Sequence, residues 1–257
     1  MMSQTSRSFR ERLVACERLL GTFIKTPSIH AVEILGGVGF DFVVIDEEHA
    51  PFDRATIDAA LLAARASGTA GLVRVAAPTP AKLLAALDDG AAGVVVPHVS
   101  SAAMAREIVS SCRYRGGSRG FSSSPRAGRY GETSMARHVE DSDAHVAVIA
   151  MIEDPAALDE IETIAAVEGL DGVFVGRADL AVALGANEVT DLAVQAAAEL
   201  IVRAARNAGK PACMLVTGAS EGQAWRAKGV SAFVVSSDQG FLRQAALSAH
   251  DEFSTLS

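Results

Sequence analysis

Cysteine is scarce in this chain, with three residues among 257 and no C-x-x-C pair. Neither a thiolate metal site nor a disulfide framework is expected, and reduced thiols in a cytoplasmic protein are the simpler interpretation. No apolar run approaches the ~20 residues of a membrane span. The first residues lead into a charged helical segment instead of the apolar core of a signal peptide. These absences predict a cytoplasmic protein with no membrane partner.

Basic residues are outnumbered, with 23 Lys and Arg against 31 Asp and Glu and a net charge of -8. A nucleic-acid partner needs a basic face, so this class of function is not expected. Small anionic substrates stay possible, because a local arginine or metal ion can outweigh the overall charge. Lysine is limited to Lys25, Lys82, Lys210 and Lys228. Lys82 and Lys228 fall on predicted helices, which leaves Lys25 and Lys210 as candidates for a disfavoured Schiff-base mechanism.

Apolar, β-rich runs alternate with Ala- and Leu-rich helical runs from end to end. The predicted strands cover residues 20–24, 42–46, 72–75, 93–97, 146–152, 172–176, 212–216 and 232–236. The predicted helices cover residues 29–35, 54–67, 80–89, 101–111, 155–167, 191–208, 220–228 and 239–252. Continuous apolar strands separated by helices indicate parallel strands covered on both faces. Eight such units predict one α/β domain over residues 1–257, a (β/α)₈ TIM barrel. An open doubly wound sheet is the competitor, but no G-x-G-x-x-G follows the first strand.

One segment, residues 113–143, interrupts this alternation. It is rich in Gly, Ser and Arg and is too long and polar for an ordinary connection. Its glycine spacing fits no phosphate-binding loop. We expect a structured excursion over the barrel mouth that lines the site or contacts another subunit, and the alternative is a flexible surface loop.

Charged residues follow four of the predicted strands at their carboxyl ends. These residues are Asp46 and His49, Arg74, Glu153, and Asp179. In a parallel barrel the site lies at this face, so the five side chains are expected to meet there. Two carboxylates on adjacent strands, Glu153 and Asp179, suit an octahedral Mg²⁺-like ion. The alternative for each acid is a helix N-cap, and Asp154 before Pro155 is expected to be one.

His49 and Arg74 are the candidates for proton transfer and charge stabilisation. Asp46 precedes His49 by three residues, close enough in a tight turn to orient its imidazole. Arg74 at a strand end is placed to hold a carboxylate or a developing oxyanion. The alternatives are a surface histidine and a structural ion pair.

Together these motifs identify a family. The chain resembles the HpcH/HpaI aldolase/citrate lyase family of metal-dependent pyruvate aldolases over nearly its whole length. The motifs are DEEHAP at residues 46–51, Val73-Arg74, Tyr114 with Arg119-Gly120, Ile152-Glu153, and GRADL at residues 176–180.

The resemblance implies a role for each of these positions. Glu153 and Asp179 would ligate a divalent cation, Mg²⁺ or Mn²⁺ and possibly Co²⁺. His49, supported by Asp46, would be the base, and Arg74 would hold the enolate oxygen of a pyruvate-like 2-oxo acid. The backbone at Gly176, Ala178 and Asp179 would receive the substrate carboxylate. The resemblance also implies a homo-oligomer, a hexamer built as a dimer of trimers, with a C-terminal helix packing on a neighbour.

Three positions depart from the common pattern of the family. Met151 stands where Gln is frequent, Arg177 where Pro is frequent, and His98 where an apolar residue is typical. A similar histidine occurs in the macrophomate synthase branch, which decarboxylates oxaloacetate and traps the enolate. His98 is therefore expected on the acceptor side of the site, and its alternative role is packing or capping at the next helix.

The function expected from this evidence is reversible aldol addition of a 2-oxo acid to an aldehyde by a carbon–carbon lyase. Oxaloacetate decarboxylation or macrophomate synthase-like enolate trapping is the alternative within enzymes. A catalytically inactive, metabolite-binding barrel is the alternative outside them.

Overall fold

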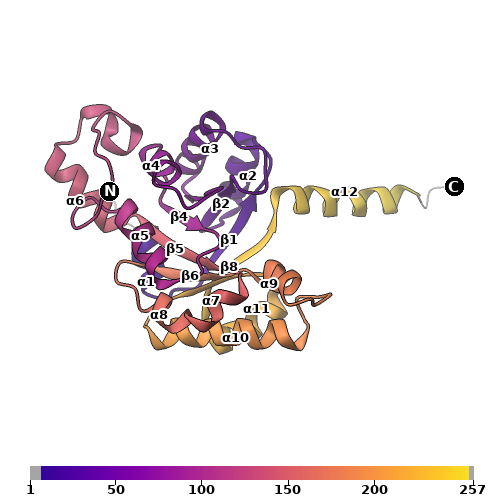
Figure 1. Cartoon of the computed structure of the whole chain (residues 1–257). Coiled ribbons are helices and arrows are strands. Elements are labelled where there is room, and N and C mark those ends of the chain that lie inside the picture. Colours follow the sequence, from indigo (N-terminus) through magenta and orange to yellow (C-terminus); the bar gives the residue numbers. More distant parts are fainter. Residues whose placement is uncertain (1–6, 255–257) are drawn as a thin grey trace.

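Eight parallel strands close into a barrel in the computed structural model of the chain, which describes residues 7–254 (Figure 1). The strands are β1 (Leu19–Ile24), β2 (Phe42–Asp46), β3 (Ala70–Arg74), β4 (Gly93–Val96), β5 (Ala147–Ile152), β6 (Gly172–Val175), β7 (Ala212–Val216) and β8 (Val230–Ser237). Each strand pairs with the next in sequence, and β8 pairs with β1. The predicted (β/α)₈ fold is confirmed.

Helices connect the strands around the barrel. They are α1 (Phe9–Val14), α2 (Ile29–Val38), α3 (Arg54–Ala66), α4 (Pro80–Asp88), α5 (Ala102–Cys112), the 3₁₀ helix η1 (Arg126–Gly131), α6 (Met135–His145), α7 (Pro155–Asp159), α8 (Ile161–Ala165), α9 (Arg177–Ala183), α10 (Leu192–Asn207), α11 (Ala219–Lys228) and α12 (Asp238–Ser254). The single helix predicted for residues 155–167 is wrong. Glu160 leaves the helical region with φ -107° and ψ 6°, and its carboxylate accepts the Ala102 N–H at the start of α5.

Strand side chains alternate between two apolar layers. One layer lies between the barrel and its helices, as at Val43 and Ile45. The other fills the barrel interior, as at Phe42 and Val44. This period of two places Asp46 on the interior face, directly after two buried apolar layers. The interior layer at the carboxyl end of the strands is therefore polar, and it forms the floor of the candidate site.

The amino end of the barrel is closed by α1 and by the long connection between α5 and β5. Phe9 of α1 packs on Phe42, with ring centroids 5.3 Å apart. In the long connection, the Arg113 guanidinium donates to the Val146 carbonyl just before β5. The connection is structured, but its predicted place over the mouth is wrong. It joins a helix to a strand, and such connections fall at the end of the barrel opposite the βα loops. Its use as a subunit contact stays a prediction.

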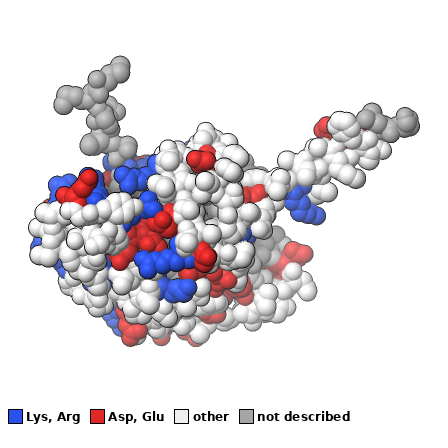
Figure 2. Space-filling model, turned by 90° about the horizontal axis from the view of Figure 1, so that it is seen from above, with Lys and Arg blue, Asp and Glu red and all other residues white. Residues whose placement is uncertain are grey.

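The C-terminal helix α12 extends away from the barrel in two perpendicular views (Figures 1 and 2). None of its described residues is buried. On the face shown in Figure 2, basic side chains lie beside acidic ones, so this face is not uniformly basic. Across residues 7–254, each helix is too short or too polar to cross a membrane. The cytoplasmic location stays a prediction.

Candidate active site

Strand register brings Asp46 and Arg74 together at the carboxyl ends of β2 and β3. They are paired positions in the sheet. The Arg74 guanidinium donates twice to the Asp46 carboxylate, from Nε at 2.9 Å and from Nη2 at 2.8 Å. Burial alone would raise the pKa of Asp46, but hydrogen bonds and charge from Arg74 and Lys25 outweigh it and hold that pKa at about 2. Asp46 is therefore a fixed anion that anchors Arg74.

Lys25, directly after β1, is the second cation on this carboxylate. Its Nζ lies 2.9 Å from Oδ2 of Asp46, and its side chain is 29% exposed. Sequence reasoning weighed Lys25 only as a Schiff-base candidate. A lysine one residue beyond a strand end was the signal that could have placed it in the site.

His49 lies at the mouth, but its contact with Asp46 differs from the expectation. The Asp46 carboxylate accepts the backbone N–H of His49 at 3.2 Å, and the structure shows no contact between that carboxylate and the imidazole. In this tight turn the carboxylate contacts the backbone of His49 and not its imidazole, because the carboxylate points to Arg74 and Lys25. The imidazole Nε2 lies instead 3.7 Å from Oε2 of Glu48. Glu48, within the DEEHAP run but not assigned a role from sequence, is the carboxylate beside the imidazole.

Glu153 follows β5 and is almost fully buried. Its Oε1 accepts the backbone N–H of His98 at 2.9 Å. Gly176 makes room for it, because a Cβ there would lie 2.7 Å from Oε2 of Glu153. Burial raises the pKa of Glu153 to about 7; the nearby charges of Asp179 and Glu48 add to the rise, and His98 opposes it.

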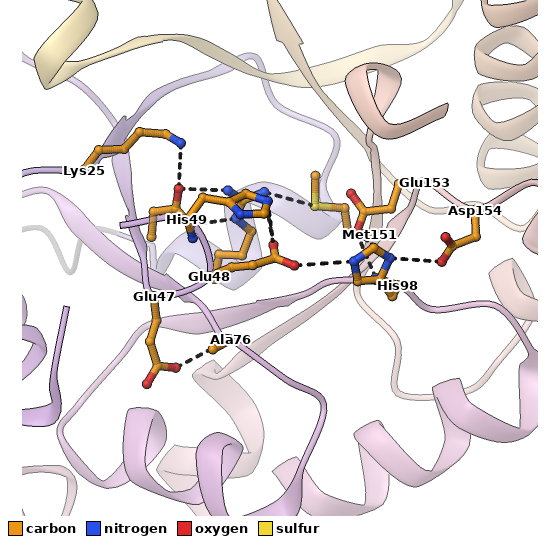
Figure 3. Close-up of polar contacts among 11 residues, drawn as sticks. Lys25, Glu47, Glu48, His49, Ala76, His98, Met151, Glu153 and Asp154 are labelled. Carbon is orange, nitrogen blue, oxygen red and sulfur yellow. Dashed lines mark hydrogen bonds and ion pairs between the residues drawn. The ribbon is translucent and has the colours of Figure 1, made fainter. Parts of the chain in front are cut away.

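His98 projects among three carboxylates (Figure 3). Its Nδ1 lies 3.1 Å from Asp154 and 3.6 Å from Glu153, and its Nε2 lies 3.5 Å from Glu48. Burial lowers the pKa of His98, but the hydrogen bond that its Nδ1 donates to the Asp154 carboxylate and the charges of the three acids produce a net rise. Asp154 is the N-cap residue of α7, as expected, but its side chain makes no capping hydrogen bond. Its carboxylate is used by His98 instead.

A cavity of about 250 Å³ opens at this end of the barrel and is called the mouth cavity below. Its wall includes Lys25, His49, Arg74, Met151, Gly176, Ala178 and Asp179. Ala178 and Asp179 lie in the first turn of α9, where backbone N–H groups have no partner within the helix. The mouth cavity therefore has Lys25 and Arg74 on its β1–β3 side, and Asp179 with the N–H groups of the first turn of α9 on its β6 side.

Next to this cavity, Glu48, His98 and Glu153 form an acidic group with the donor set of a divalent cation site. Glu48, His98 and Glu153 each offer one atom, and these atoms lie within 4.8 Å of one another. Oε2 of Glu48 is buried and accepts no hydrogen bond. Carboxylates with one imidazole suit Mg²⁺, Mn²⁺ or Co²⁺. These residues fit a metal ion. The group contains Glu153 but not Asp179, and the role of Asp179 as a ligand stays a prediction.

This fold and this site define the class of the protein. A closed parallel barrel with acids, histidines and an anchored arginine at the carboxyl ends of its strands is a TIM-barrel enzyme with its site in the usual place. The chain belongs to the HpcH/HpaI aldolase/citrate lyase family, whose sequence model matches residues 19–245. It is a carbon–carbon lyase of the aldolase type, as the resemblance implied.

Individual relatives carry different activities in their names. A 5-keto-4-deoxy-D-glucarate aldolase of Klebsiella pneumoniae subsp. pneumoniae is 34% identical over 247 residues, which cover 95% of this chain and 96% of the relative. The structure of the citrate synthase SbnG is 31% identical with a TM-score of 0.86, covering 96% of this chain and 98% of that one. The structure of macrophomate synthase is 26% identical with a TM-score of 0.86, covering 96% and 90%. The family is thus established, and the particular reaction is a separate question.

Proposed function

We propose that this enzyme is a divalent-metal-dependent aldolase that joins a pyruvate-like 2-oxo acid to an aldehyde through an enolate, and that it also catalyses the reverse cleavage of 4-hydroxy-2-oxo acids. The observation that carries the proposal is an anchored arginine next to an acidic group that could hold a cation. Arg74, fixed by Asp46, lines the mouth cavity, and its Nη1 lies 3.3 Å from Glu48 of the group formed by Glu48, His98 and Glu153. The aldolase name of the Klebsiella relative supports the same reaction type.

Each side of the cavity has a distinct task in this proposal. Glu153 and Asp179 would hold the metal, Mg²⁺, Mn²⁺ or Co²⁺, with Glu48 and His98 close by. A bound divalent cation supplies a Lewis acid that stabilises negative charge on the oxygens of the 2-oxo acid. The backbone N–H groups of Ala178 and Asp179 would receive the substrate carboxylate. Gly176 leaves room for the Glu153 carboxylate, since a Cβ there would lie 2.7 Å from its Oε2.

Proton transfer and oxyanion stabilisation fall to the other side. His49 would remove a proton from C3 of the 2-oxo acid, and its Nε2 faces the Glu48 carboxylate. Arg74 would donate to the enolate oxygen. Its two bonds to Asp46 use Nε and Nη2, so Nη1 remains directed towards Glu48 and the cavity. Because the guanidinium is already oriented, little reorganisation is needed as charge develops.

Decarboxylation of oxaloacetate with trapping of the enolate is the second candidate. The observation that favours it is His98, which lies among Glu48, Glu153 and Asp154 at the mouth. The similarity to macrophomate synthase points the same way. The alternative outside enzymes, a metabolite-binding barrel without catalysis, is disfavoured by membership of an aldolase/lyase family and by the paired Asp46 and Arg74.

One experiment separates these candidates. Purified enzyme, stripped with EDTA and reloaded with Mg²⁺ or Mn²⁺, is assayed for aldol addition of pyruvate to a panel of aldehydes and for CO₂ release from oxaloacetate. The proposal expects metal-dependent aldol turnover. Decarboxylation alone would favour the second candidate, and the absence of both reactions would contradict both candidates.

We also propose that α12 packs on another copy of the chain within a hexamer, a dimer of trimers. Leu242, Leu247 and Phe253 on α12 are exposed, at 72%, 44% and 71%. Leu242 also lines an apolar groove with Ile34 of α2. Light scattering should give a mass near six times 26.6 kDa, and Leu247→Asp should lower it. A wild-type monomer would contradict this assembly.

A further inference from the structure

We infer that the buried ion pair between Arg177 and Glu221 holds the β6–α9 turn, residues 176–179, in the position that metal and substrate binding need. This inference rests on the proposed function and adds a positioning residue to the same site. Arg177 acts through the backbone of its own turn, and Asp179, the proposed metal ligand, is the residue that it places.

The start of α9 needs support from elsewhere in the molecule. Arg177 is the first residue of α9, and Asp179 follows two residues later. The N-cap residue is Gly176, so no side chain caps the helix, and α9 has only seven residues. A short helix without a side-chain cap has little stability of its own. The position of Asp179 therefore depends on contacts that other elements make with this turn.

The Arg177 side chain supplies such contacts. Its Nη1 donates to Oε1 of Glu221 at 2.6 Å, and its Nη2 donates to the Leu215 carbonyl at 2.7 Å. Leu215 lies on β7 and Glu221 on α11, so the guanidinium ties the β6–α9 turn to the next unit of the barrel. The side chain is only 4% exposed. Charge-assisted hydrogen bonds from a planar guanidinium fix both its distance and its direction.

Glu221, the other end of this ion pair, is itself held in place. Its Oε2 accepts the backbone N–H of Thr217 at 2.7 Å and the Thr217 hydroxyl at 2.9 Å. Burial raises the pKa of Glu221, but the hydrogen bonds from Arg177 and Thr217 outweigh it and leave that pKa below its usual value. The indole of Trp225 lies 5.7 Å from the guanidinium carbon of Arg177. The ion pair therefore joins two fixed points.

The turn that Arg177 holds is in contact with the acidic group. The N–H of Gly176 donates to the carbonyl of Ile152, directly before Glu153, at 3.0 Å. A Cβ on Gly176 would lie 2.6 Å from Cβ of Glu153, so the turn already packs as closely as glycine allows. If the ion pair were lost, the turn could move only away from Glu153. Asp179 would move with it.

The alternative is that Arg177 binds a substrate anion directly, because it lines the mouth cavity. The two interpretations differ at Glu221, which lies outside the wall of this cavity. Replacing Glu221 would release the guanidinium and leave a direct binding role intact. It would remove a positioning role, since the turn would lose its anchor.

The test uses Arg177→Met, Arg177→Lys, Glu221→Gln and the double variant Arg177→Met/Glu221→Gln. Mn²⁺ affinity is measured by EPR titration, kcat and the KM for pyruvate in the aldol reaction, and stability by thermal unfolding. Asp88→Asn is the matched control, because it breaks the ion pair with the buried Arg119, 3.1 Å away, at the amino end of the barrel. Asp179→Asn gives the effect of losing the proposed ligand itself.

Arg177→Met and Glu221→Gln should each weaken Mn²⁺ binding and raise the KM for pyruvate by about 10-fold, the lower end of the usual effect of groups that position a metal ligand. The fall in kcat should be smaller, because His49 and Arg74 stay in place. The double variant should resemble either single variant, since all three remove the same contact. Arg177→Lys should recover part of the affinity. Asp88→Asn should lower the unfolding temperature without changing Mn²⁺ affinity or KM.

Wild-type Mn²⁺ affinity and KM in Glu221→Gln would overturn the proposal, and so would additive losses in the double variant, which would make Arg177 a direct binding residue. A loss of affinity in Asp179→Asn within the same titration shows that such a failure does not come from the metal assignment. Weakened Mn²⁺ binding in Glu221→Gln without any aldol turnover by the wild type would support the positioning role while refuting the proposed function.

Discussion

Asp46 and Arg74 occupy paired positions on β2 and β3, and their side chains form a two-point ion pair inside the barrel, at 2.9 and 2.8 Å. The pair lies above two apolar interior layers and is almost completely shielded from solvent. It sets the orientation of the one arginine that faces both the acidic cluster and the mouth cavity. Loss of this ion pair should therefore affect both the catalytic activity and the stability of the fold.

Stability at low pH should report the ionisation of Asp46. Its folded-state pKa of about 2 lies below the unfolded value of 3.8, so its ionised form stabilises the fold above pH 4, and this stabilisation is lost as the pH falls towards 2. Asp46→Asn should lower the free energy of unfolding at pH 7 by about 2 kcal/mol, and less at pH 3. Urea unfolding at the two pH values measures this, with the exposed Asp251→Asn as the control. A difference that does not depend on pH would contradict the assignment.

Metal affinity should depend on Glu153 and Asp179. Glu153→Gln and Asp179→Asn each remove one anionic oxygen ligand and should weaken Mn²⁺ binding by at least about 10–100-fold. Calorimetry and the Mn²⁺ EPR spectrum measure this without any turnover. Glu162→Gln, at an exposed position of α8, serves as the control. Wild-type affinity in Glu153→Gln would remove this residue from the metal site.

Replacing His49 and replacing Arg74 should have different effects on pyruvate proton exchange and on oxaloacetate decarboxylation. His49→Ala should slow deuterium exchange into pyruvate by about 10²–10⁴-fold, the usual contribution of a positioned base. Its effect on oxaloacetate decarboxylation should be smaller, since loss of CO₂ forms the enolate without removing a C3 proton. Arg74→Ala should slow both reactions, because both pass through the enolate. Normal exchange in His49→Ala would mean that another group is the base.

Replacing His98 should affect the reaction with the aldehyde acceptor more than it affects metal binding. It has a left-handed backbone with φ 55°, so Asn is the better-tolerated replacement. His98→Asn should change kcat/KM for aldehydes by about tenfold, as expected for one contact of ~1.4 kcal/mol, while Mn²⁺ affinity stays near that of the wild type. A fall in Mn²⁺ affinity like that of Glu153→Gln would make His98 a ligand instead.

Sequence patterns predicted the barrel well, because continuous apolar strands and intervening helices have strong periodicity. The five residues expected at the carboxyl face do come together, since all of them follow parallel strands. Contacts of individual side chains were harder to predict. From the sequence, the Asp46 carboxylate could have pointed to the His49 imidazole. Only the arrangement of the strands shows that this carboxylate contacts Arg74 and Lys25 instead. Glu48 carries no local pattern that separates a site residue from a solvated one, and the signal for Lys25 is limited to its place one residue beyond β1.

The position of the 113–143 segment shows a second limit. Its length and polarity indicated function, and the mouth was the expected place. Chain order argues otherwise, because the segment follows a helix and precedes a strand. At the start of the segment, Arg113 pairs with Asp171, just before β6, at 2.8 Å.

The most direct measurement of the central claim, enolisation of a 2-oxo acid, is proton exchange of pyruvate in D₂O followed by ¹H NMR. With enzyme and Mg²⁺ or Mn²⁺, the methyl signal should decay faster than in a protein-free control with the same metal, and EDTA should stop the enzymatic exchange. The reaction needs no aldehyde, so the unknown acceptor does not enter. A methyl signal that persists as in the control, with folded and metal-loaded enzyme, would contradict the proposed function.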